Sequence, residues 1–422
     1  MRLPKFLLKA INGFYSKRMD EWLDKGYIDL FVEHHYADKE SCCHRCKSPF
    51  SHITGYYRQK IQTMPIFQYK TFIHLKRRKG YCDKCKKIRA EHLEFIAPET
   101  PHLTREYVWW LGRMCEISAV SRVGELVGIN KMTMHRLDFN RLKRMFQHYK
   151  IPKVTRISVD EVYARKKKYH SKESRDNRFF TIVCDLDTRR VIWVSESRKK
   201  EALDEFFKAI GEDRCKDIDV VAIDQHDSYK ASVNEHCPMA TVVWDRFHVM
   251  QNFNEAVDTD RKWLHEHICR GETKRLSRGK FKRLFVTKSE RRSKTDNRHI
   301  NTLMKENQDF VYLELIKEGM HQLYDSRDEY EAREKFVQLG EWIRQCKYFF
   351  ELNKWWDKFD KGWSTFKNYF YYRVSSSLSE GQNNVIKTLK KRGYGYRNMA
   401  YFKLKILQVC GFLNSKYVSM EF

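Results

Sequence analysis

Residues 156–161 decide the fold and read Arg156-Ile157-Ser158-Val159-Asp160-Glu161, a short apolar run that ends in two acidic residues. The chain repeats this arrangement further on, where Val220-Val221-Ala222-Ile223 leads into Asp224. Short apolar runs of this kind are typical of buried β-strands. Because such strands project side chains into the crevice beyond the end of the sheet, we expect Asp160 and Asp224 to lie in a functional site.

The segments around these runs predict a mixed α/β sheet. Strand-like runs span residues 154–162, 179–185, 191–195 and 220–224, and a helical pattern spans residues 200–210. The chain between the two aspartates therefore has room for a hairpin, a third strand and a crossover helix. This order matches an RNase H-like sheet, whose first and fourth strands lie side by side.

A third acidic residue, Glu380, opens a segment with helical spacing. The serines just before it supply oxygens that can cap a helix, and a carboxylate at a helix start interacts favourably with the helix dipole. The predicted buried side comprises Val385, Ile386 and Leu389. The predicted polar face comprises Glu380, Asn383, Asn384, Lys387 and Lys391.

The charge of the chain indicates nucleic acid as its partner. The 422 residues include 82 Lys and Arg against 55 Asp and Glu, a formal net charge of +27, and a basic surface attracts a polyanion. Three isolated carboxylates in such a chain predict an enzyme that holds divalent metal against a nucleic-acid phosphate. Taken singly, each acid could instead form a turn or a cap. Competing acids are Glu161, Asp185, Asp187 and Asp227, of which Asp185 and Asp187 fit a hairpin turn better.

Two Cys-x-x-Cys pairs, Cys43 with Cys46 and Cys82 with Cys85, have the spacing of a zinc site. Zinc prefers four thiolate or imidazole ligands in a tetrahedron, and each pair supplies one edge of it. The stretch between the pairs predicts the strands of a zinc ribbon, in which we favour a structural over a catalytic ion. Alternative ligands are Cys42 and His44, and the basic residues expected to meet DNA phosphate are Lys76, Arg77, Arg78 and Lys79.

Residues 121–137 have the residue pattern of a helix-turn-helix. Val123, Leu126 and Val127 give one apolar face, Gly128 permits a tight turn, and Asn130 can cap the second helix. Such a second helix fits a DNA major groove, although an ordinary helical hairpin is the alternative. Its predicted exposed side comprises Lys131, Thr133, His135 and Arg136.

The rest of the chain predicts a helical insertion and a helical arm. Residues 251–370 are rich in charge and aromatics without a strand pattern, and their aromatic residues fit a helical core better than base stacking. If any aromatic stacks on a base, Trp355 and Trp356 are the first candidates. The predicted domains are a helical arm (1–40), a zinc ribbon (41–100), a helix-turn-helix domain (101–150), a first part of the catalytic core (151–250), an all-helical insertion (251–370) and a last part with the glutamate helix (371–422).

No run of 18 apolar residues is present, so we expect no membrane-spanning helix. The first residues lack the features of a cleavable leader. We therefore expect a cytoplasmic protein that has no membrane partner and is associated with the nucleoid when it is bound to DNA.

These features together resemble bacterial insertion-sequence transposases of the DDE type, most closely the ISL-three family. The resemblance covers residues 40–412 and includes the zinc ribbon, the helix-turn-helix and the two aspartate strands. Trp244-Asp245-Arg246-Phe247-His248-Val249 matches an Asp-x-x-His signature of related transposases. The most specific part runs from Glu380-Gly381-Gln382-Asn383-Asn384-Val385-Ile386-Lys387 to Arg392-Gly393-Tyr394-Gly395-Tyr396-Arg397-Asn398.

The resemblance implies an RNase H-like catalytic domain in which Asp160, Asp224 and Glu380 hold two Mg²⁺ (or Mn²⁺) ions, besides one structural Zn²⁺. It gives Asp245 and His248 a role in ordering the active site, and a helix cap is the alternative for His248. We add Asn384 and Lys387 as supporting residues, and Lys391, Arg392 and Arg397 as DNA-binding residues.

The activity that this resemblance implies is cleavage at the terminal inverted repeats of an insertion sequence, followed by strand transfer into target DNA. Because two ends must be joined, we expect a homodimer or a larger assembly on double-stranded DNA. Two alternatives stay open. One is a non-catalytic or repurposed DNA-binding regulator, and the other is an RNase H-like DNA nuclease without strand transfer.

Overall fold

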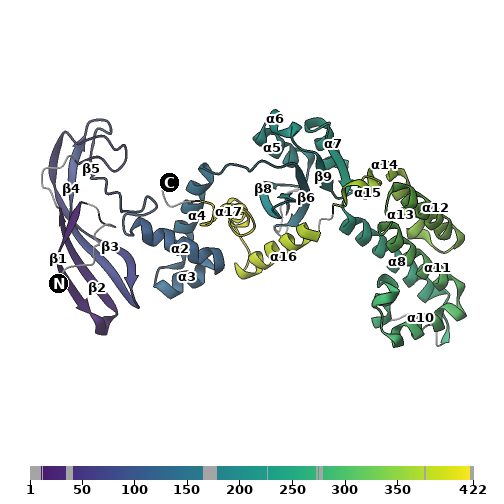
Figure 1. Cartoon of the computed structure of the whole chain (residues 1–422). Helices are drawn as coiled ribbons and strands as arrows, with labels where there is room; N and C mark the ends of the chain where they lie inside the picture. The colour runs from purple at the N-terminus through teal and green to yellow at the C-terminus, as the bar shows by residue number, and fades with distance from the viewer. Residues whose placement is uncertain are drawn as a thin grey trace, which may run out of the picture. The chain divides into compact units, whose positions relative to one another are not determined.

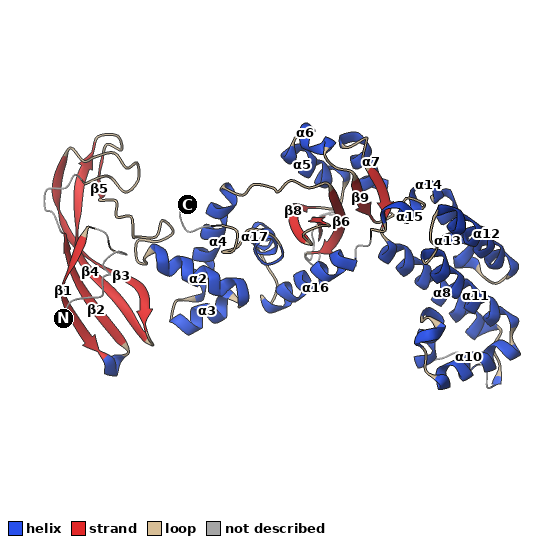
Figure 2. Ribbon diagram, viewed as in Figure 1, coloured by secondary structure: helices blue, strands red, loops and turns tan. Residues whose placement is uncertain are grey.

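The structure is a computed structural model of the chain and describes residues 11, 13–34, 41–164, 178–225, 227–271, 274, 279–374 and 377–418. Its contacts divide the chain into two compact units, residues 1–150 with 390–422, and residues 151–389. Figures 1 and 2 show the elements of each unit. Within the described residues, no helix combines the length and the apolar character needed to cross a bilayer.

The first unit begins with a five-stranded sheet in the order β1-β2-β4-β3, with β5 beside β4. β1 and β2 form an antiparallel hairpin, which closes at Gly26 with a φ of 76°. β2 then runs parallel to β4, and β3 and β4 form a long antiparallel hairpin. The bounds are β1 Phe14–Trp22, η1 Leu23–Lys25, β2 Tyr27–His34, β3 His52–Ile66, β4 Tyr69–Cys82 and β5 Lys87–Ala90.

Residues 14–34 form strands and not the helical arm that we predicted for residues 1–40. In β2, Ile28, Leu30 and Val32 are buried at a spacing of two residues, which is the period of a strand. The prediction was wrong because a short apolar pattern fits either period, and the pairing of β2 with the distant β4 decides between them. Residues 1–10, 12 and 35–40 lie outside the described residues.

A helical group follows the sheet in the first unit, with bounds α2 Arg105–Ile117, α3 Val120–Val127, α4 Lys131–Gln147 and α17 Met399–Cys410. Gly128 ends α3 with a φ of 69°, and the Asn130 side chain accepts a hydrogen bond from the Met132 N–H at 2.9 Å. The predicted turn and cap are therefore present. Leu126, which we placed on the buried face, is 69% exposed, because it lies about 60° of helix rotation from Val123 and about 100° from Val127, beyond the edge of the packed face.

A buried polar network fixes α17 to α4. Asp138 accepts hydrogen bonds from the Tyr401 hydroxyl at 2.6 Å and from Arg141 at 3.1 Å, and lies 3.3 Å from Lys405 Nζ. Burial opposes the charge of Asp138, but the two cations and the hydroxyl outweigh it and lower the pKa of this carboxyl. The network corrects our prediction for residues 371–422, because the part from residue 390 onward packs with the first unit.

The second unit contains a five-stranded sheet in the order β10-β9-β6-β7-β8. β6, β7 and β8 are antiparallel neighbours, whereas β6, β9 and β10 run parallel. The strands and the helix predicted between residues 154 and 224 are confirmed, as is the predicted mixed sheet. The bounds are β6 Arg156–Tyr163, β7 Phe179–Asp185, β8 Arg190–Glu196, α5 Lys200–Ile210, α6 Glu212–Lys216, β9 Val220–Ile223, α7 Asp227–His236 and β10 Thr241–Trp244.

Helices follow β10 and share one continuous apolar core with β9 and β10. Trp356, Phe359 and Phe366 are almost fully buried in this core, which confirms the core-packing interpretation of these aromatics. Trp355 is half-buried and stacks on Phe359 with ring centroids 4.6 Å apart. The bounds are α8 Arg246–His267, η3 Gly279–Val286, η4 Ser289–Arg291, α10 Lys294–Glu306, α11 Gln308–Tyr324, α12 Glu329–Gln345, α13 Phe350–Lys361, α14 Trp363–Phe366 and α15 Tyr369–Tyr372.

The glutamate helix is α16, Ser377–Arg392. Ile386 and Leu389 are buried as predicted, but Val385 is 42% exposed. Ile386 and Leu389, three positions apart, share a helix face, whereas Val385 lies about 100° of helix rotation from Ile386 and about 40° from Leu389, at the edge of that face. Residues 375 and 376, and the side chains of residues 377–380, lie outside the described part of the structure.

Candidate active site and zinc site

The register of β6 and β9 places Asp160 and Asp224 level with each other. In this parallel pair, Ser158 lies opposite Ala222, and each aspartate follows two residues further on. Alternate residues of a strand point to the same face, and neighbouring strands lie about 4.8 Å apart. The two carboxylates predicted as metal ligands therefore belong to one face and one edge of the sheet.

Asp245 extends this row to the next strand. Trp244 pairs with Ile223, and the Asp245 N–H donates to the Ile223 carbonyl at 2.8 Å, so Asp245 is level with Asp224. Asp160 and Asp245 are buried, at 8% and 3% exposure, and Asp224 is half-buried. Three acids on three adjacent parallel strands concentrate negative charge at this edge, which requires compensating cations.

His248 supplies part of that compensation. Its Nε2 atom lies 3.3 Å from Asp160 Oδ1 and 3.6 Å from Asp245 Oδ2. Burial alone lowers the pKa of this imidazole, but the contact with Asp160 and the charges of Asp245 and Asp224 outweigh it and raise the pKa to about 9. His248 is therefore a cation at neutral pH.

We left open that His248 caps a helix, but the residue that caps α8 is Asp245. Asp245 Oδ1 accepts a hydrogen bond from the Phe247 N–H at 3.0 Å and caps the start of α8. One carboxylate thus fixes the helix start and contacts the imidazole one turn later. The Asp-x-x-His spacing follows from this geometry, because residues three apart share a helix face.

Asn383 connects α16 to the aspartate row. Its Nδ2 atom donates a hydrogen bond to Asp160 Oδ2 at 2.7 Å. We predicted Asn383 on the polar face of this helix but assigned the supporting role to Asn384 and Lys387, and both of these are exposed. Spacing alone could not have selected Asn383, because Asn383 is three and Asn384 four residues from Glu380, and both spacings share a helix face. Glu380 itself lies in α16, and its side chain is among those that the structure does not describe.

The competing acids lie in other environments. Asp185 accepts hydrogen bonds from the Asp187 N–H at 3.0 Å and from the Thr188 hydroxyl at 2.5 Å, as expected of a hairpin turn. Glu161 Oε2 lies 3.5 Å from Arg198. Asp227 is exposed at the start of α7.

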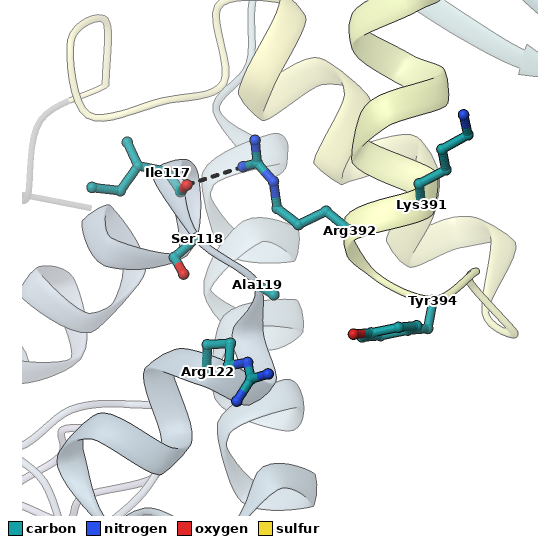
Figure 3. Close-up of a pocket in the computed structure, with 7 residues that line it drawn as sticks. All are labelled: Ile117, Ser118, Ala119, Arg122, Lys391, Arg392 and Tyr394. Atoms are coloured by element: carbon teal, nitrogen blue, oxygen red, sulfur yellow. Dashed lines mark hydrogen bonds between the residues drawn. The ribbon is translucent and has the colours of Figure 1, made fainter.

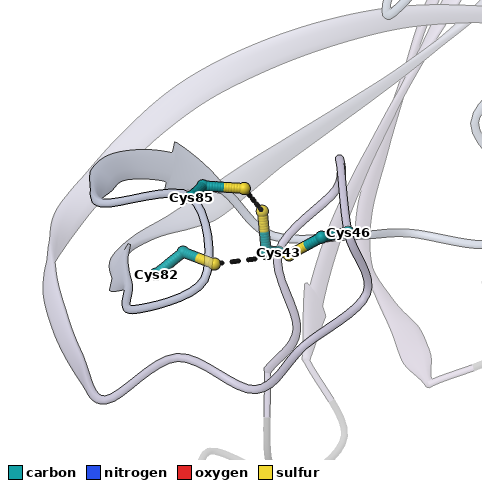
Figure 4. A group of neighbouring side chains, drawn as sticks. All are labelled: Cys43, Cys46, Cys82 and Cys85. Carbon is teal, nitrogen blue, oxygen red and sulfur yellow. Dashed lines mark hydrogen bonds between the residues drawn. The ribbon is translucent and has the colours of Figure 1, made fainter.

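The four predicted zinc ligands converge in the first unit, as Figure 4 shows. All four sulfur atoms lie within 4.8 Å of one another, with Cys43 and Cys85 at 3.9 Å and Cys46 and Cys82 at 3.4 Å. Zn–S bonds of about 2.3 Å in a tetrahedron place sulfurs roughly 3.8 Å apart, so the cluster fits a zinc ion. Hydrogen bonds from Ser48 lower the pKa of Cys46 to about 6, whereas burial raises the pKa of Cys82, and the hydrogen bond with Cys46 raises the pKa of Cys85 to about 12. Zinc binding would therefore displace protons from this cluster. The alternative ligands Cys42 and His44 are outside the cluster.

Comparison with known proteins identifies the family. A family model described as a transposase, of the ISL3 type of DDE transposases, matches residues 157–406, and a model of the zinc finger of the IS204/IS1001/IS1096/IS1165 transposases matches residues 39–85. The chain belongs to the ISL3 family of DDE transposases. This confirms the predicted family and enzyme class.

The curated relatives that resemble this chain are also transposases of insertion sequences. The transposase for insertion sequence element IS1001 of Bordetella parapertussis is 23% identical over 422 residues, which cover 96% of this chain and 98% of the relative. Transposases for insertion sequence element IS1557 from two strains of Mycobacterium tuberculosis are each 24% identical over 280 residues, which cover 61% of this chain and 60% of theirs. The first relative therefore spans both units.

Two residues predicted to contact DNA in this transposase are turned inward instead. Arg77 is 5% exposed and donates hydrogen bonds to the Glu91 carbonyl and, at 3.1 Å, to Gln59. Arg78 is 7% exposed and pairs with the Glu91 carboxylate at 2.8 Å. The prediction of DNA contact was wrong for these two arginines because both bind Glu91, and the local sequence of β4 does not show that Glu91 packs against them. Lys76 and Lys79 are exposed, and their contact with DNA stays a prediction.

The second helix of the helix pair keeps part of its predicted exposed face. Lys131 and Arg136 are exposed, and Thr133 is half-buried. The ring of His135 packs against Tyr401 with centroids 4.3 Å apart, and burial lowers its pKa, which corrects its placement on the exposed side. The other predicted DNA-binding residues, Lys391, Arg392 and Arg397, are exposed.

Proposed function

We propose that this transposase cuts the ends of an insertion sequence and joins them to target DNA at a site formed by Asp160, Asp224 and Glu380. The observation that carries the proposal is the hydrogen bond from Asn383 to Asp160. It brings α16 to the edge where Asp160 and Asp224 lie level. Because residues three apart share a helix face, Glu380 belongs to the face of α16 that carries Asn383.

The proposed catalytic fold is RNase H-like. Its support is the strand order, in which an antiparallel β6-β7-β8 meander is extended by two parallel strands beside β6. In this arrangement, the helices between β10 and α16 form the insertion. We further propose that α3 and α4 act as a helix-turn-helix, on the basis of the Gly128 turn and the Asn130 cap.

The residues at the sheet edge fit divalent metal. Carboxylate oxygens are the ligands that Mg²⁺ prefers, and Asp160 and Asp224 offer them from neighbouring strands. We assign two Mg²⁺ (or Mn²⁺) ions to Asp160, Asp224 and Glu380. When bound, the ions would activate the attacking oxygen and stabilise the leaving oxygen of a phosphodiester.

The surrounding side chains orient this site. Asn383 donates to one oxygen of Asp160, and His248 lies against the other, so the carboxylate has a fixed orientation. Asp245 holds His248 in place while it caps α8. Asn383, His248 and Asp245 are therefore positioning residues, whose loss would misplace Asp160 without removing a ligand.

We propose that the zinc ribbon and the helix pair recognise double-stranded DNA at the terminal inverted repeats. The support is the exposed basic residues Lys76, Lys131 and Arg136, together with the net charge of +27. Joining two ends requires two active sites in one complex, so we propose a homodimer or a larger assembly on DNA.

A strand-transfer assay tests this function against the alternatives. A labelled duplex that ends in the pre-cut terminus of the element is mixed with plasmid and Mg²⁺ or Mn²⁺, and joined product is measured. Wild type should join the label to plasmid, whereas Asp160→Asn should bind the duplex and join none. Hydrolysis without joining would indicate a nuclease, and binding without either reaction would indicate a regulator.

A further inference from the structure

The first unit contains a hollow of about 430 Å³ beside the C-terminal end of α16. Figure 3 shows its walls, which come from the loop between α2 and α3, the start of α3, and the residues around the end of α16. The lining residues are Ile117, Ser118, Ala119, Arg122, Lys391, Arg392 and Tyr394. The hollow lies in a unit that does not contain the aspartate row, so the proposed catalytic site does not account for it.

Tyr394 occupies a backbone position that usually belongs to glycine. The Gly395 N–H donates to the Lys390 carbonyl at 2.9 Å and the Tyr394 N–H to the Lys391 carbonyl at 3.0 Å, the pair of bonds that ends many helices. In this motif, the first residue beyond the helix end adopts a left-handed backbone conformation. That residue is Tyr394, which has a φ of 52°. A side chain is costly in that conformation, and such residues concentrate at ligand sites. Glycine stands on both sides of Tyr394, yet not at Tyr394 itself.

The ring of Tyr394 is also unusually open. The residue is 91% exposed, although a large aromatic side chain gains by burial. Ile117, on another wall of the hollow, is 73% exposed. An exposed aromatic and an exposed aliphatic side chain around one hollow provide apolar surfaces that a flat ligand could cover.

The rim of the hollow is cationic. Arg122, Lys391 and Arg392 line it, and none of its seven described lining residues is acidic. Arg392 uses one N–H to hold the Ile117 carbonyl at 3.0 Å and has further donors. Arg122 pairs with Glu125 at 2.9 Å, but both side chains are more than 60% exposed, and such a surface pair is weak enough for a phosphate to replace.

We propose that this hollow binds an unpaired nucleotide of a DNA strand, with its base stacked on Tyr394 and its phosphates paired with Arg122, Lys391 and Arg392. An aromatic face beside cations is the combination that holds single-stranded nucleic acid. A base within an intact duplex presents only its edges, so the base that stacks here is unpaired. The proposal deepens the DNA-transposase function above and rests on it for the identity of the nucleic acid.

Fluorescence of 2-aminopurine tests the proposal in the full-length, zinc-loaded protein without added divalent metal. The probe is an oligothymidine of about twelve nucleotides with one 2-aminopurine, whose emission falls when it stacks. Wild type should quench the probe, and Tyr394→Phe should quench it equally. Tyr394→Ala should lose the quenching and bind the strand about ten-fold more weakly. Binding of a duplex of the same length should change less than two-fold.

Tyr330→Ala is the matched control, because Tyr330 on α12 is 84% exposed but lies outside the hollow. It should quench like wild type. Tyr394→Gly provides a second variant that accepts a positive φ without strain, so a fold defect cannot explain its loss of quenching.

The proposal is overturned if Tyr394→Ala and Tyr394→Gly quench like wild type, or if both weaken duplex binding as much as strand binding. Neither result depends on catalysis, since the assay contains no metal for cleavage. If wild type fails to transfer strands but still quenches the probe in a way that depends on Tyr394, the proposed function is rejected and the proposed nucleotide site is retained.

Discussion

The contact between Asn383 and Asp160 gives the most specific prediction, because two adjacent asparagines have different environments. Asn383 donates to Asp160 at 2.7 Å, whereas Asn384 is exposed. A hydrogen bond to a charged group contributes about 1.5–3 kcal/mol. If the bond holds Asp160 in its reactive orientation, Asn383→Ala should lower the single-turnover cleavage rate by about 10- to 150-fold. Asn384→Ala should change it less than three-fold.

The assay is cleavage of a labelled duplex that carries the element's end, with protein in excess and the Mg²⁺ concentration varied. A positioning role predicts that Asn383→Ala needs more Mg²⁺ for half-maximal rate, while its affinity for the duplex is unchanged. Thermal unfolding of both variants controls for loss of fold. Equal rates for the two alanine variants, or a slow Asn383→Ala with an unchanged Mg²⁺ requirement, would refute the role assigned to this contact.

Three further predictions concern stability and zinc. A Cβ at Gly362 would overlap the Trp244 indole, so Gly362→Ala should destabilise the second unit by about 1–3 kcal/mol in thermal unfolding. Cys82→Ser should lose the zinc measured by mass spectrometry, together with duplex binding. Burial, and then the charges of Lys288 and Lys317, lower the pKa of His321 to about 4, so its neutral form should stabilise the fold above pH 6.5 and progressively less down to pH 4. Unfolding midpoints across that range should show a loss of about 1–3 kcal/mol.

Each of these three has a matched control. Gly381→Ala should not destabilise, because nothing lies within 4 Å of a Cβ there. Cys42→Ser should keep its zinc, since Cys42 is outside the cluster. His321→Gln should remove the acid-dependent loss. A destabilised Gly381→Ala, zinc loss in Cys42→Ser, or an unchanged pH profile in His321→Gln would contradict the respective explanation.

Local sequence patterns predicted the features that depend on neighbouring residues. The apolar runs before Asp160 and Asp224 became β6 and β9, and the Gly128 turn and Asn130 cap lie where expected. The cysteine spacing likewise predicted the two ligand pairs, because each short Cys-x-x-Cys turn positions its own two sulfurs. These features are encoded within a few residues of the chain.

Features that depend on distant partners could not be predicted in this way. The inward position of Arg78 depends on Glu91 of another segment, and the packing of α17 depends on the pairing of Asp138 with Lys405. The choice between Asn383 and Asn384 depends on a helix rotation of about 100°, which spacing alone does not fix relative to the sheet. The strands of residues 14–34 were missed because β4, not their own sequence, determines their period.

We expect Glu380 to act with Asp160 and Asp224 in one site. The measurement that tests it most directly is nicking of the labelled end duplex in Mg²⁺ or Mn²⁺ by wild type, by Glu380→Gln and by Asp227→Asn, which changes an exposed acid at the start of α7. All three proteins should bind the duplex equally. Wild type and Asp227→Asn should nick it, and Glu380→Gln should nick it at least about a thousand-fold more slowly. Nicking by Glu380→Gln at the wild-type rate would contradict a catalytic role of Glu380.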